Sequence, residues 1–214
     1  LDINKINTPL IGKDVEQMEF LFENLGESTF RGRQLFDWIY RRKIDDISMM
    51  TNLPTELRAK LKSIPFHPLK LVINKYSKSN ETTKFVFMLK DGQKVESVLM
   101  KGDNRITICL STQVGCAVDC KFCATAKMGF KKNLSVGEII DQFFQIQSII
   151  NQRITNVVFM GMGEPFLNYD NTINAANLLH HPKGINLGAK RITISTAGVV
   201  PKINRYTKER QPYR

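Results

Sequence analysis

The sequence has no apolar run that approaches the roughly 20 consecutive residues needed to span a bilayer. It also shows no N-terminal signal peptide, with a basic start, an apolar middle and a small-residue cleavage site. This second absence carries less weight, because the chain begins at Leu1 rather than at Met. We therefore expect a cytoplasmic protein with no membrane partner.

Acidic residues are scarce relative to basic ones. The chain of 214 residues has 20 Asp and Glu against 31 Lys and Arg, which gives a net charge of +11. The first fifty residues carry −2, residues 51–100 carry +5, and residues 101–214 carry +8. Such an excess favours a polyanionic partner, either nucleic acid or an anionic membrane. Charge alone is also consistent with a basic surface that only keeps the protein in solution.

Cysteine is rare too, and its few positions are clustered. Cys116, Cys120 and Cys123 lie within eight residues, and the fourth cysteine is Cys109. This is a poor layout for a disulfide framework that staples distant loops together. A reduced, cytoplasmic setting with a bound metal is the better interpretation.

Apolar periodicity predicts a small helical domain over residues 1–68. Its expected helices run through residues 15–25, 32–43 and 54–61. Three short helices of this kind form a small bundle. By composition the bundle is interpreted as a structural cap, and the alternative is an RNA-holding module.

The pattern then changes to strands. Residues 69–104 are predicted to form a β-hairpin linker region, with a turn signal at residues 90–93, and residues 105–214 a βαβαβ unit. Ser135 and Glu138 read as a capping box at the start of a long helix. The expected strands cover residues 71–76, 83–89, 94–100, 106–111, 155–160 and 191–196, and the expected helices cover residues 135–151 and 171–180. This order implies an α/β fold with a parallel sheet or barrel, whose sites lie at the carboxyl ends of the strands.

The central motif is a loop with the spacing Cys-x₃-Cys-x₂-Cys at Cys116, Cys120 and Cys123. Thiolate is the ligand that iron–sulfur clusters use, and three thiolates leave one iron of a [4Fe–4S] cluster open. Free buried cysteines would not cluster in this way. A structural zinc site usually takes two separated pairs, and no second Cys or His pair follows. An electron-transfer ferredoxin would need a fourth ligand, for which Cys109 is the candidate, so a cluster with an open iron is favoured.

Cys109 itself lies in the expected strand 106–111. Strand alternation places it with Thr107 and Ser111 on one face, while the apolar residues of the strand share the other. In a parallel barrel the apolar face packs under the helices, so Cys109 would point into the lumen. A thiol in the lumen near a cluster could take part in the reaction. The alternative is that Cys109 is a small residue buried only for packing. The spacing leaves these two interpretations open.

Taken together, these motifs resemble those of a known family. The cysteine spacing, with Phe122 before the last cysteine, is similar to that of the radical SAM superfamily, whose enzymes use a [4Fe–4S] cluster and S-adenosyl-L-methionine (SAM). Four further segments resemble the RlmN-type dual-specificity methyltransferases. These segments are Val95-Glu-Ser-Val-Leu-Met100, Ser111-Thr-Gln-Val-Gly-Cys116, Gly161-Met-Gly-Glu-Pro165 and Ser195-Thr-Ala-Gly-Val-Val-Pro201. The resemblance implies a partial (βα) barrel of the radical SAM type that carries a helical cap.

This family acts on adenine C2 in 23S rRNA and in tRNA, and a related Cfr-type family methylates adenine C8 instead. Val114 before Gly115, and Pro165 after Glu164, are more similar to the RlmN type. The resemblance therefore implies a radical SAM RNA methyltransferase with 23S rRNA and tRNA as partners. It also implies an electron donor such as flavodoxin or ferredoxin.

The resemblance assigns the cofactor-binding residues. The three loop cysteines match the cluster ligands, and the open iron binds the amino and carboxylate groups of SAM. Gly163 and Glu164 match residues that hold the SAM amino group, and Ser195 matches a further SAM contact. A carboxylate is a sensible partner for an ammonium group. Without the motif, Glu164 would be interpreted as a loop carboxylate that caps the next helix.

The resemblance also assigns two catalytic residues. Cys109 matches a mechanistic cysteine, and Glu96 matches a glutamate that handles a proton at the adenine; alone, Glu96 would be interpreted as a solvated carboxylate. In the family, a cysteine near the C-terminus is methylated by one SAM, and its methyl group is activated by the radical from a second. The thiol matching Cys109 then releases the product by disulfide exchange.

The sequence departs from the family pattern at its end. It stops at Arg214, before the later barrel strands, and none of its four cysteines matches the methyl-carrying one. We expect a chain cut about half way through the barrel and inactive as a methyltransferase by itself. The rival interpretation is a non-catalytic module that only binds RNA and holds a cluster.

Overall fold

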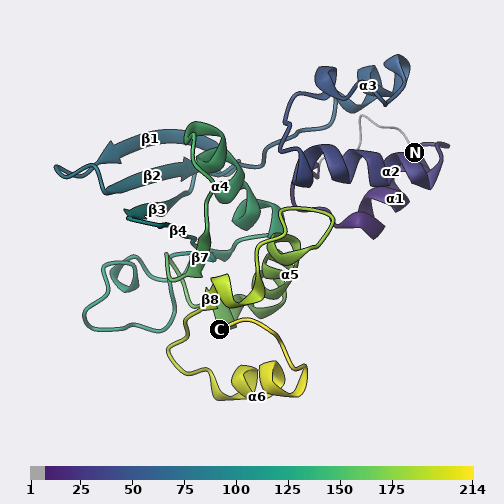
Figure 1. Ribbon diagram of the computed structural model, residues 1–214. Coiled ribbons are helices and arrows are strands. Elements are labelled where there is room, and N and C mark those ends of the chain that lie inside the picture. Colours follow the sequence, from purple (N-terminus) through teal and green to yellow (C-terminus); the bar gives the residue numbers. More distant parts are fainter. Residues whose placement is uncertain (1–7) are drawn as a thin grey trace.

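The computed structural model of the chain describes residues 8–214 (Figure 1). The first seven residues of the predicted 1–68 domain lie outside this range. The helical region contains α1, α2 and α3, two of them close to their predicted bounds. Their bounds are Val15–Asn24 for α1, Thr29–Phe36 for α2 and Thr55–Leu61 for α3, with a 3₁₀ turn at Ile47–Met49.

The second helix differs from the prediction of residues 32–43. It begins at Thr29, and it continues as a π-helix over Asp37–Arg41. The wider π turn allows three consecutive residues, Trp38 to Tyr40, to be buried together. Gly32 lies inside the helix because a Cβ there would come within 2.6 Å of the Glu19 nitrogen on α1. Close contact between the two helices therefore depends on this glycine.

A six-stranded sheet forms the centre of the molecule, in the order β1-β2-β3-β4-β7-β8 (Figure 1). The strands are β1 Lys70–Tyr76, β2 Thr82–Met88, β3 Lys94–Gly102, β4 Arg105–Cys109, β7 Asn156–Phe159 and β8 Ile192–Ile194. Strands β1 to β4 are antiparallel, and β4, β7 and β8 are parallel. The predicted hairpin region thus continues directly into the parallel strands, and the division into domains at residues 68 and 104 stays a prediction.

Two helices cover one face of the sheet. They are α4, Val136–Ile149, and α5, Tyr169–His180, close to their predicted bounds. The predicted capping box is present, since the Ser135 hydroxyl accepts from the Glu138 nitrogen and the Glu138 carboxylate accepts from the Ser135 nitrogen. Alternate strand residues such as Ile108 and Val157 are fully buried under these helices. The predicted α/β fold with a partly parallel sheet is confirmed.

Several elements were not predicted. A short antiparallel pair joins β5, Gln113–Val114, to β6, Lys132–Asn133. Helix α6, Val200–Lys208, buries none of its residues, although Tyr206 packs against the cluster of Phe166, Tyr169 and Ile173. Three 3₁₀ turns complete the structure, at Ala126–Met128, Pro165–Asn168 and Ala189–Arg191. None of the helices found within residues 8–214 has the length and apolar character needed to cross a membrane.

His67 connects the helical region to α4. Its Nδ1 lies 2.5 Å from Asp141 Oδ1, and its Nε2 lies 3.5 Å from Asp45 Oδ2. The Asp141 side chain is fully buried, and it also accepts hydrogen bonds from the Leu69 nitrogen and from Gln145. Burial by itself would lower the pKa of His67, but the Asp141 carboxylate, helped by Asp45, raises it overall.

Candidate metal and cofactor site

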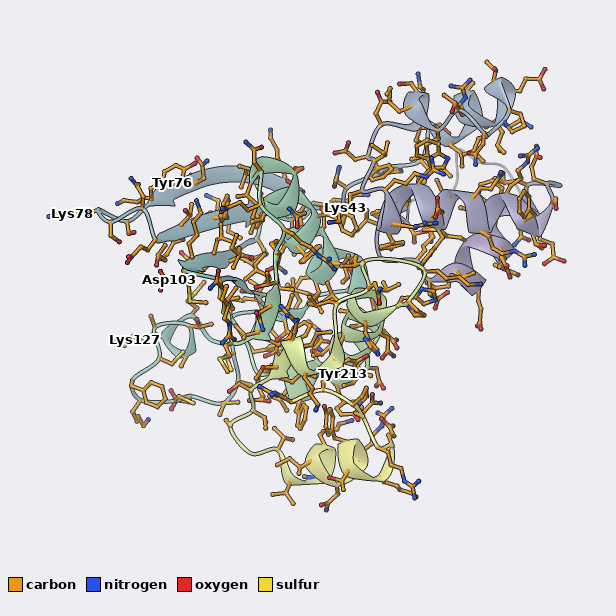
Figure 2. All side chains as sticks on the ribbon, viewed as in Figure 1. Lys43, Tyr76, Lys78, Asp103, Lys127 and Tyr213 are labelled. Carbon is orange, nitrogen blue, oxygen red and sulfur yellow. The ribbon has the colours of Figure 1, made fainter. Side chains whose placement is uncertain are left out.

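The cysteine motif lies in a loop that the β5–β6 pair closes at its base. Gly115 and Gly129 face each other there, both with positive φ. A Cβ on Gly115 would lie 1.7 Å from the Gly129 carbonyl oxygen, so no other residue fits. Figure 2 shows Lys127 of this loop at the periphery of the molecule, away from the helical region. The ends of the loop are therefore fixed, and its middle projects from the sheet.

The three loop cysteines are free and half-buried. Backbone N–H groups of Ala126 and Thr125 donate to Cys123, and the first of these bonds does most to lower the pKa of its thiol. A lowered pKa favours the thiolate that binds metal. No group of three or more His, Cys, Asp or Glu side chains within residues 8–214 is placed to hold a metal ion. The donor set thus fits an iron–sulfur cluster in its chemistry, while the three sulfurs are not gathered into a ligand set.

Cys109 lies on β4, outside the loop. Its backbone pairs with Val98 on β3 and with Val158 on β7. Burial raises the pKa of its thiol, and a hydrogen bond from the Met160 backbone only partly offsets this effect. The group is therefore a protonated thiol at neutral pH. Its strand position faces the side of the sheet that α4 and α5 leave uncovered, as predicted for a lumenal residue.

Glu96 lies on β3 and shares this uncovered face. Strand alternation puts it on the same side as Val98, which is the cross-strand partner of Cys109. Its carboxylate pairs with Lys84 Nζ at 2.9 Å, and its side chain is 45% exposed. The backbone carbonyl of Glu96 also accepts from the Ser111 hydroxyl. The structure thus brings Glu96 and Cys109 together on neighbouring strands, although their catalytic roles stay predictions.

Gly163 and Glu164 follow β7 at its carboxyl end. Gly163 has a φ of +97°, and a Cβ there would come within 2.4 Å of the Gln113 Cβ. Glu164 is only 4% exposed, and its two carboxylate oxygens accept from the backbone nitrogens of Phe166 and Ala197. It therefore caps the following 3₁₀ turn, the alternative considered from sequence, and it also connects β7 to the segment after β8.

Ser195 directly follows β8 and is exposed. Its backbone nitrogen continues the ladder by donating to the Phe159 carbonyl at 3.4 Å. Gly163, Glu164 and Ser195 thus lie at the carboxyl ends of neighbouring parallel strands, as the motif positions predict. No contact in the structure tests their role in binding SAM, so that role stays a prediction.

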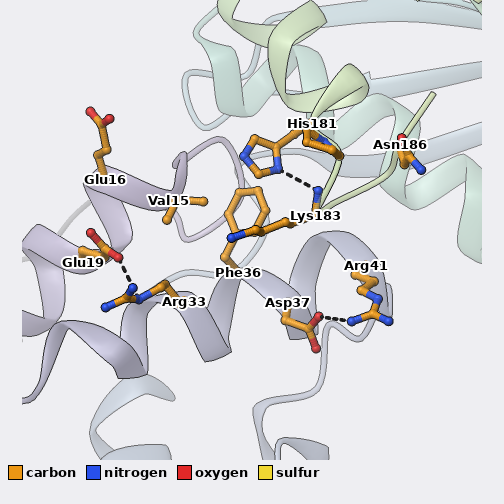
Figure 3. Close-up of a pocket in the computed structure, with 11 residues that line it drawn as sticks. Val15, Glu16, Glu19, Arg33, Phe36, Asp37, Arg41, His181, Lys183 and Asn186 are labelled. Atoms are coloured by element: carbon orange, nitrogen blue, oxygen red, sulfur yellow. Dashed lines mark hydrogen bonds and ion pairs between the residues drawn. The ribbon is translucent and has the colours of Figure 1, made fainter. Parts of the chain in front are cut away.

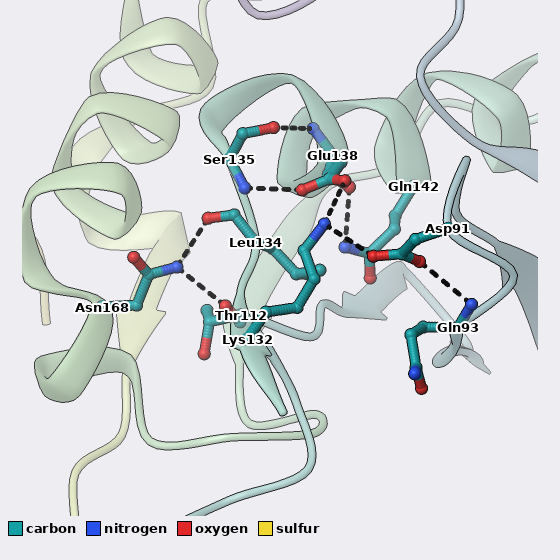
Figure 4. A network of polar contacts seen from close by, with 9 residues as sticks. All are labelled: Asp91, Gln93, Thr112, Lys132, Leu134, Ser135, Glu138, Gln142 and Asn168. Carbon is teal, nitrogen blue, oxygen red and sulfur yellow. Dashed lines mark hydrogen bonds and ion pairs between the residues drawn. The ribbon is translucent and has the colours of Figure 1, made fainter. Parts of the chain in front are cut away.

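A polar junction that we did not predict lies beneath the cysteine loop (Figure 4). Gln142 of α4 is fully buried, and its Oε1 accepts from the Ser97 hydroxyl at 2.6 Å and from the Ser111 nitrogen at 2.9 Å. Its Nε2 donates to the Ser111 carbonyl at 3.0 Å and to the Glu138 carbonyl at 3.0 Å, and Figure 4 draws the second of these bonds. Asn168 donates to the carbonyls of Thr112 and Leu134, so both ends of the cysteine loop are held by amide side chains. The only signal in the sequence was a polar Asp141-Gln142 pair inside an otherwise apolar helix face.

A cleft of about 840 Å³ lies elsewhere, between helices α1 and α2 and the turn at residues 181–186 (Figure 3). Its walls carry charges of both signs, and several are already paired, as in Glu19–Arg33 and Asp37–Arg41. None of the predicted site residues lines it. The cleft therefore has no part in the candidate site.

Comparisons with known proteins give a consistent result. The Ribosomal RNA large subunit methyltransferase N-terminal domain family matches residues 8–65, and the Radical SAM superfamily matches residues 110–210. A probable dual-specificity RNA methyltransferase RlmN of Symbiobacterium thermophilum is 43% identical over 207 residues, which cover 95% of this chain and 56% of that protein. The protein of the same name from Thermotoga petrophila is 45% identical over 203 residues, with coverages of 94% and 59%.

One solved structure is similar in both sequence and shape. It is the crystal structure of a radical SAM methyltransferase from Sphaerobacter thermophilus, with a TM-score of 0.90 and 41% identity. The match covers 97% of this chain and 62% of that one. The chain thus spans somewhat more than half the length of the curated relatives it matches.

Proposed function

The chain belongs to the RlmN family of radical SAM RNA methyltransferases, and from this premise we propose that it takes part in methylating C2 of adenine in 23S rRNA and tRNA. One observation supports the proposal most directly. Glu96 and Cys109 share the uncovered face of the sheet, and the cysteine loop and the motif at Gly163-Glu164 begin at the carboxyl ends of that same sheet. In parallel α/β folds, this edge is where reacting groups meet.

The cofactors of the proposed reaction are a [4Fe–4S] cluster and SAM. Cys116, Cys120 and Cys123 would hold the cluster, and Gly163, Glu164 and Ser195 would contact SAM. When bound, the pair supplies one-electron cleavage chemistry that amino-acid side chains lack. The buried Glu164 carboxylate already accepts two N–H groups, and a carboxylate has lone pairs left for an ammonium group.

The catalytic roles rest on the uncovered face. Glu96 would take the proton that leaves the adenine, and Lys84 Nζ lies 2.9 Å from its carboxylate. Cys109 would release the product by forming a disulfide with the methyl-carrying cysteine of the family pattern, as the bond from that sulfur to the product carbon breaks and the carbon takes up a proton. Its thiol is protonated at neutral pH, so it needs to lose its proton before it can attack. An electron donor such as flavodoxin or ferredoxin, and a cytoplasmic location, complete the proposal.

The test is mass spectrometry of the RNA product. The full-length protein is reconstituted with iron and sulfide under anaerobic conditions and given SAM, a reductant and unmodified 23S rRNA fragments or tRNA. We expect 2-methyladenosine, and none from the Cys116→Ala variant. Formation of 8-methyladenosine would assign the Cfr-type activity instead. RNA binding with neither product would support a module that only binds RNA and holds a cluster.

A further inference from the structure

The antiparallel strands β1 to β3 carry most of their charge on one face. Five lysines lie in these strands, and the register places four of them on the side opposite α4. The four are Lys70, Lys75, Lys84 and Lys94, which we call the lysine face. Lys101 of β3 is the exception, because strand alternation turns it to the other side. Glu96 is the only acidic residue of these strands on the lysine face.

A bulge in β1 produces this arrangement. Lys70 and Lys75 are five positions apart, so in a regular strand they would lie on opposite faces. The register shifts between Leu71 and Ile73, and as a result Lys70 pairs with Met88 and Lys75 with Lys84. Both partners lie on the same side of β2. The extra residue therefore moves Lys70 onto the face that already holds Lys75.

The charges on this face are not balanced within the protein. Lys75 and Lys84 are direct cross-strand partners, and like charges in such positions are destabilising. Lys84 has one ion pair, with Glu96. Within residues 8–214 no ion pair is found for Lys70, Lys75 or Lys94, and all three are exposed. A face with this pattern is complementary to a polyanion.

Apolar side chains lie between the lysines. Ile73 is 52% exposed, and Val86, Met88 and Val98 on the same face are half-buried. Lysines with interleaved apolar groups suit a nucleic-acid strand, because phosphates take the charges and bases or sugars cover the apolar surface. Figure 2 shows Tyr76 at the far end of this hairpin, which extends away from the helical region. All four lysines of the face are exposed to solvent.

The cross-strand register connects this face to the candidate catalytic residues. A single row runs from Lys75 through Lys84 and Val98 to Cys109. Lys84 also pairs with Glu96 on the adjacent row. A polyanion that lies on the lysine face therefore ends beside the two residues proposed to act on the adenine. This continuity favours RNA over an acidic protein as the occupant.

We propose that the lysine face is a docking surface for the RNA segment next to the target adenine, with Lys70, Lys75 and Lys94 on its phosphates. The inference rests on the proposed function and adds to it the place where the substrate strand lies. It assigns a binding role to the hairpin region, which the sequence alone suggested only as a linker.

The experiment measures RNA affinity of the full-length protein without SAM or reductant. A fluorescent tRNA transcript is titrated at several salt concentrations with the variant Lys70→Gln/Lys75→Gln/Lys94→Gln. The control, Lys60→Gln/Lys62→Gln/Lys101→Gln, removes the same charge from exposed positions off the lysine face. For three phosphate contacts we expect affinity to fall on the order of tenfold or more, and the log–log salt slope to decrease by about 2. The control should change neither value substantially.

Equal losses in both variants would overturn the proposal, because the effect would then be general charge. Unchanged RNA binding would overturn it as well, and slower reduction by flavodoxin in the lysine-face variant would then assign the face to an acidic protein. Iron content and circular dichroism show whether each variant is folded. A second measurement uses the unmutated protein. Bound tRNA should protect Lys70, Lys75 and Lys94 from acylation but leave Lys101 reactive. Equal protection of all four lysines, or of none, would also overturn the proposal.

These outcomes are separate from the proposed function. RNA binding is read without methylation, so a protein that makes no 2-methyladenosine can still show the lysine-face effect. Conversely, a lysine-face variant that binds RNA normally leaves the methylation assay of the unmutated protein unaffected.

Discussion

The cysteine loop and the polar junction beneath it share a boundary at Thr112 and Leu134 but differ in how they are held. In the loop, the cysteines are free and half-buried. In the junction, Gln142 and Asn168 are buried, and their amide groups are hydrogen-bonded to backbone on both sides of the loop. The proposed ligands thus lie between two anchor points that buried amide side chains hold.

This difference separates two tasks, which are binding of the proposed cluster by the loop and positioning of the other site residues by the junction. A loop whose sulfurs are not gathered can close around a cluster as ligation supplies the energy. The junction keeps the same strands in register whether or not a cluster is bound, so Glu96, Cys109 and Glu164 keep their relative positions. Changes to the loop should therefore affect cofactor content, and changes to the junction should affect stability.

The largest effect is expected from the loop cysteines. Cys116→Ala, Cys120→Ala or Cys123→Ala should each remove nearly all iron after anaerobic reconstitution, because a cubane held by three thiolates has no spare ligand. Cys109→Ala should keep full iron content, since its thiol is on a strand outside the loop. Iron counting and Mössbauer spectroscopy make the comparison. Loss of iron in the Cys109 variant would favour a four-cysteine, ferredoxin-like cluster.

The next effect concerns the glycines at the base of the loop. Gly115→Ala should reduce the free energy of unfolding by about 3 kcal/mol or more, because it combines a positive φ with overlap on the Gly129 carbonyl. Gly26→Ala after α1 is the matched control, with a similar φ of +73° and nothing within 4 Å of the new Cβ. It should cost about 1 kcal/mol. Urea denaturation measures the free energy of unfolding of both variants. Equal losses would show that the close contact between Gly115 and the Gly129 carbonyl does not affect stability.

A smaller effect is expected from the junction. Gln142→Ala should destabilise the protein by about 2 kcal/mol, since it leaves the buried nitrogen and carbonyl of Ser111 without partners. Gln147→Ala on the same helix should cost less, about 1 kcal/mol, because its bond to the Gln152 carbonyl is exposed and its bond from the Ile154 nitrogen is only partly buried. Thermal or chemical unfolding measures both. A larger loss in the Gln147 variant would contradict the picture of a fixed junction.

The smallest effect is a pH dependence at His67. The pKa of His67 is higher in the folded protein than in the unfolded chain, so protonation of His67 stabilises the fold. This stabilisation is fully present below the pKa of the unfolded chain, and it is lost as pH rises through the higher pKa of the folded protein. The free energy of unfolding should therefore fall as pH rises from the ordinary histidine pKa of about 6.5 through the raised pKa of His67. The facing groups are Asp141 and Asp45. His67→Gln should remove this part of the slope, and a variant with the unchanged slope would assign it to other groups.

Local patterns in the sequence were enough to predict most elements. Alternation and periodicity identified the six main strands and helices α1, α3, α4 and α5 within a few residues. The capping box at Ser135 is a local feature, and it was found where predicted. The cysteine spacing and the motif at Gly163-Glu164 are local as well, so the sequence alone is enough to locate the candidate site.

Features that depend on contacts between distant segments could not be predicted. Gln142 interacts with Ser97 and Ser111, and those partners are 45 and 31 residues away. The β1 bulge is defined by pairing with β2, and the bare sequence shows only an apolar run there. The π-helix in the second helix depends on burial of Trp38 to Tyr40 in the fold. In each case the deciding partner is set by the register of the sheet or the packing of the helices.

The β1 bulge has one more consequence, for how copies of the protein behave toward each other. β1 is an edge strand of the six-stranded sheet, and the unpaired backbone donors and acceptors of an edge strand can pair with a strand of another molecule. The bulge interrupts their regular spacing, and Lys70 and Lys75 put positive charge beside it. A second sheet cannot align with this border without bringing like charges together. The residues proposed to attract RNA therefore also discourage two molecules from joining edge to edge.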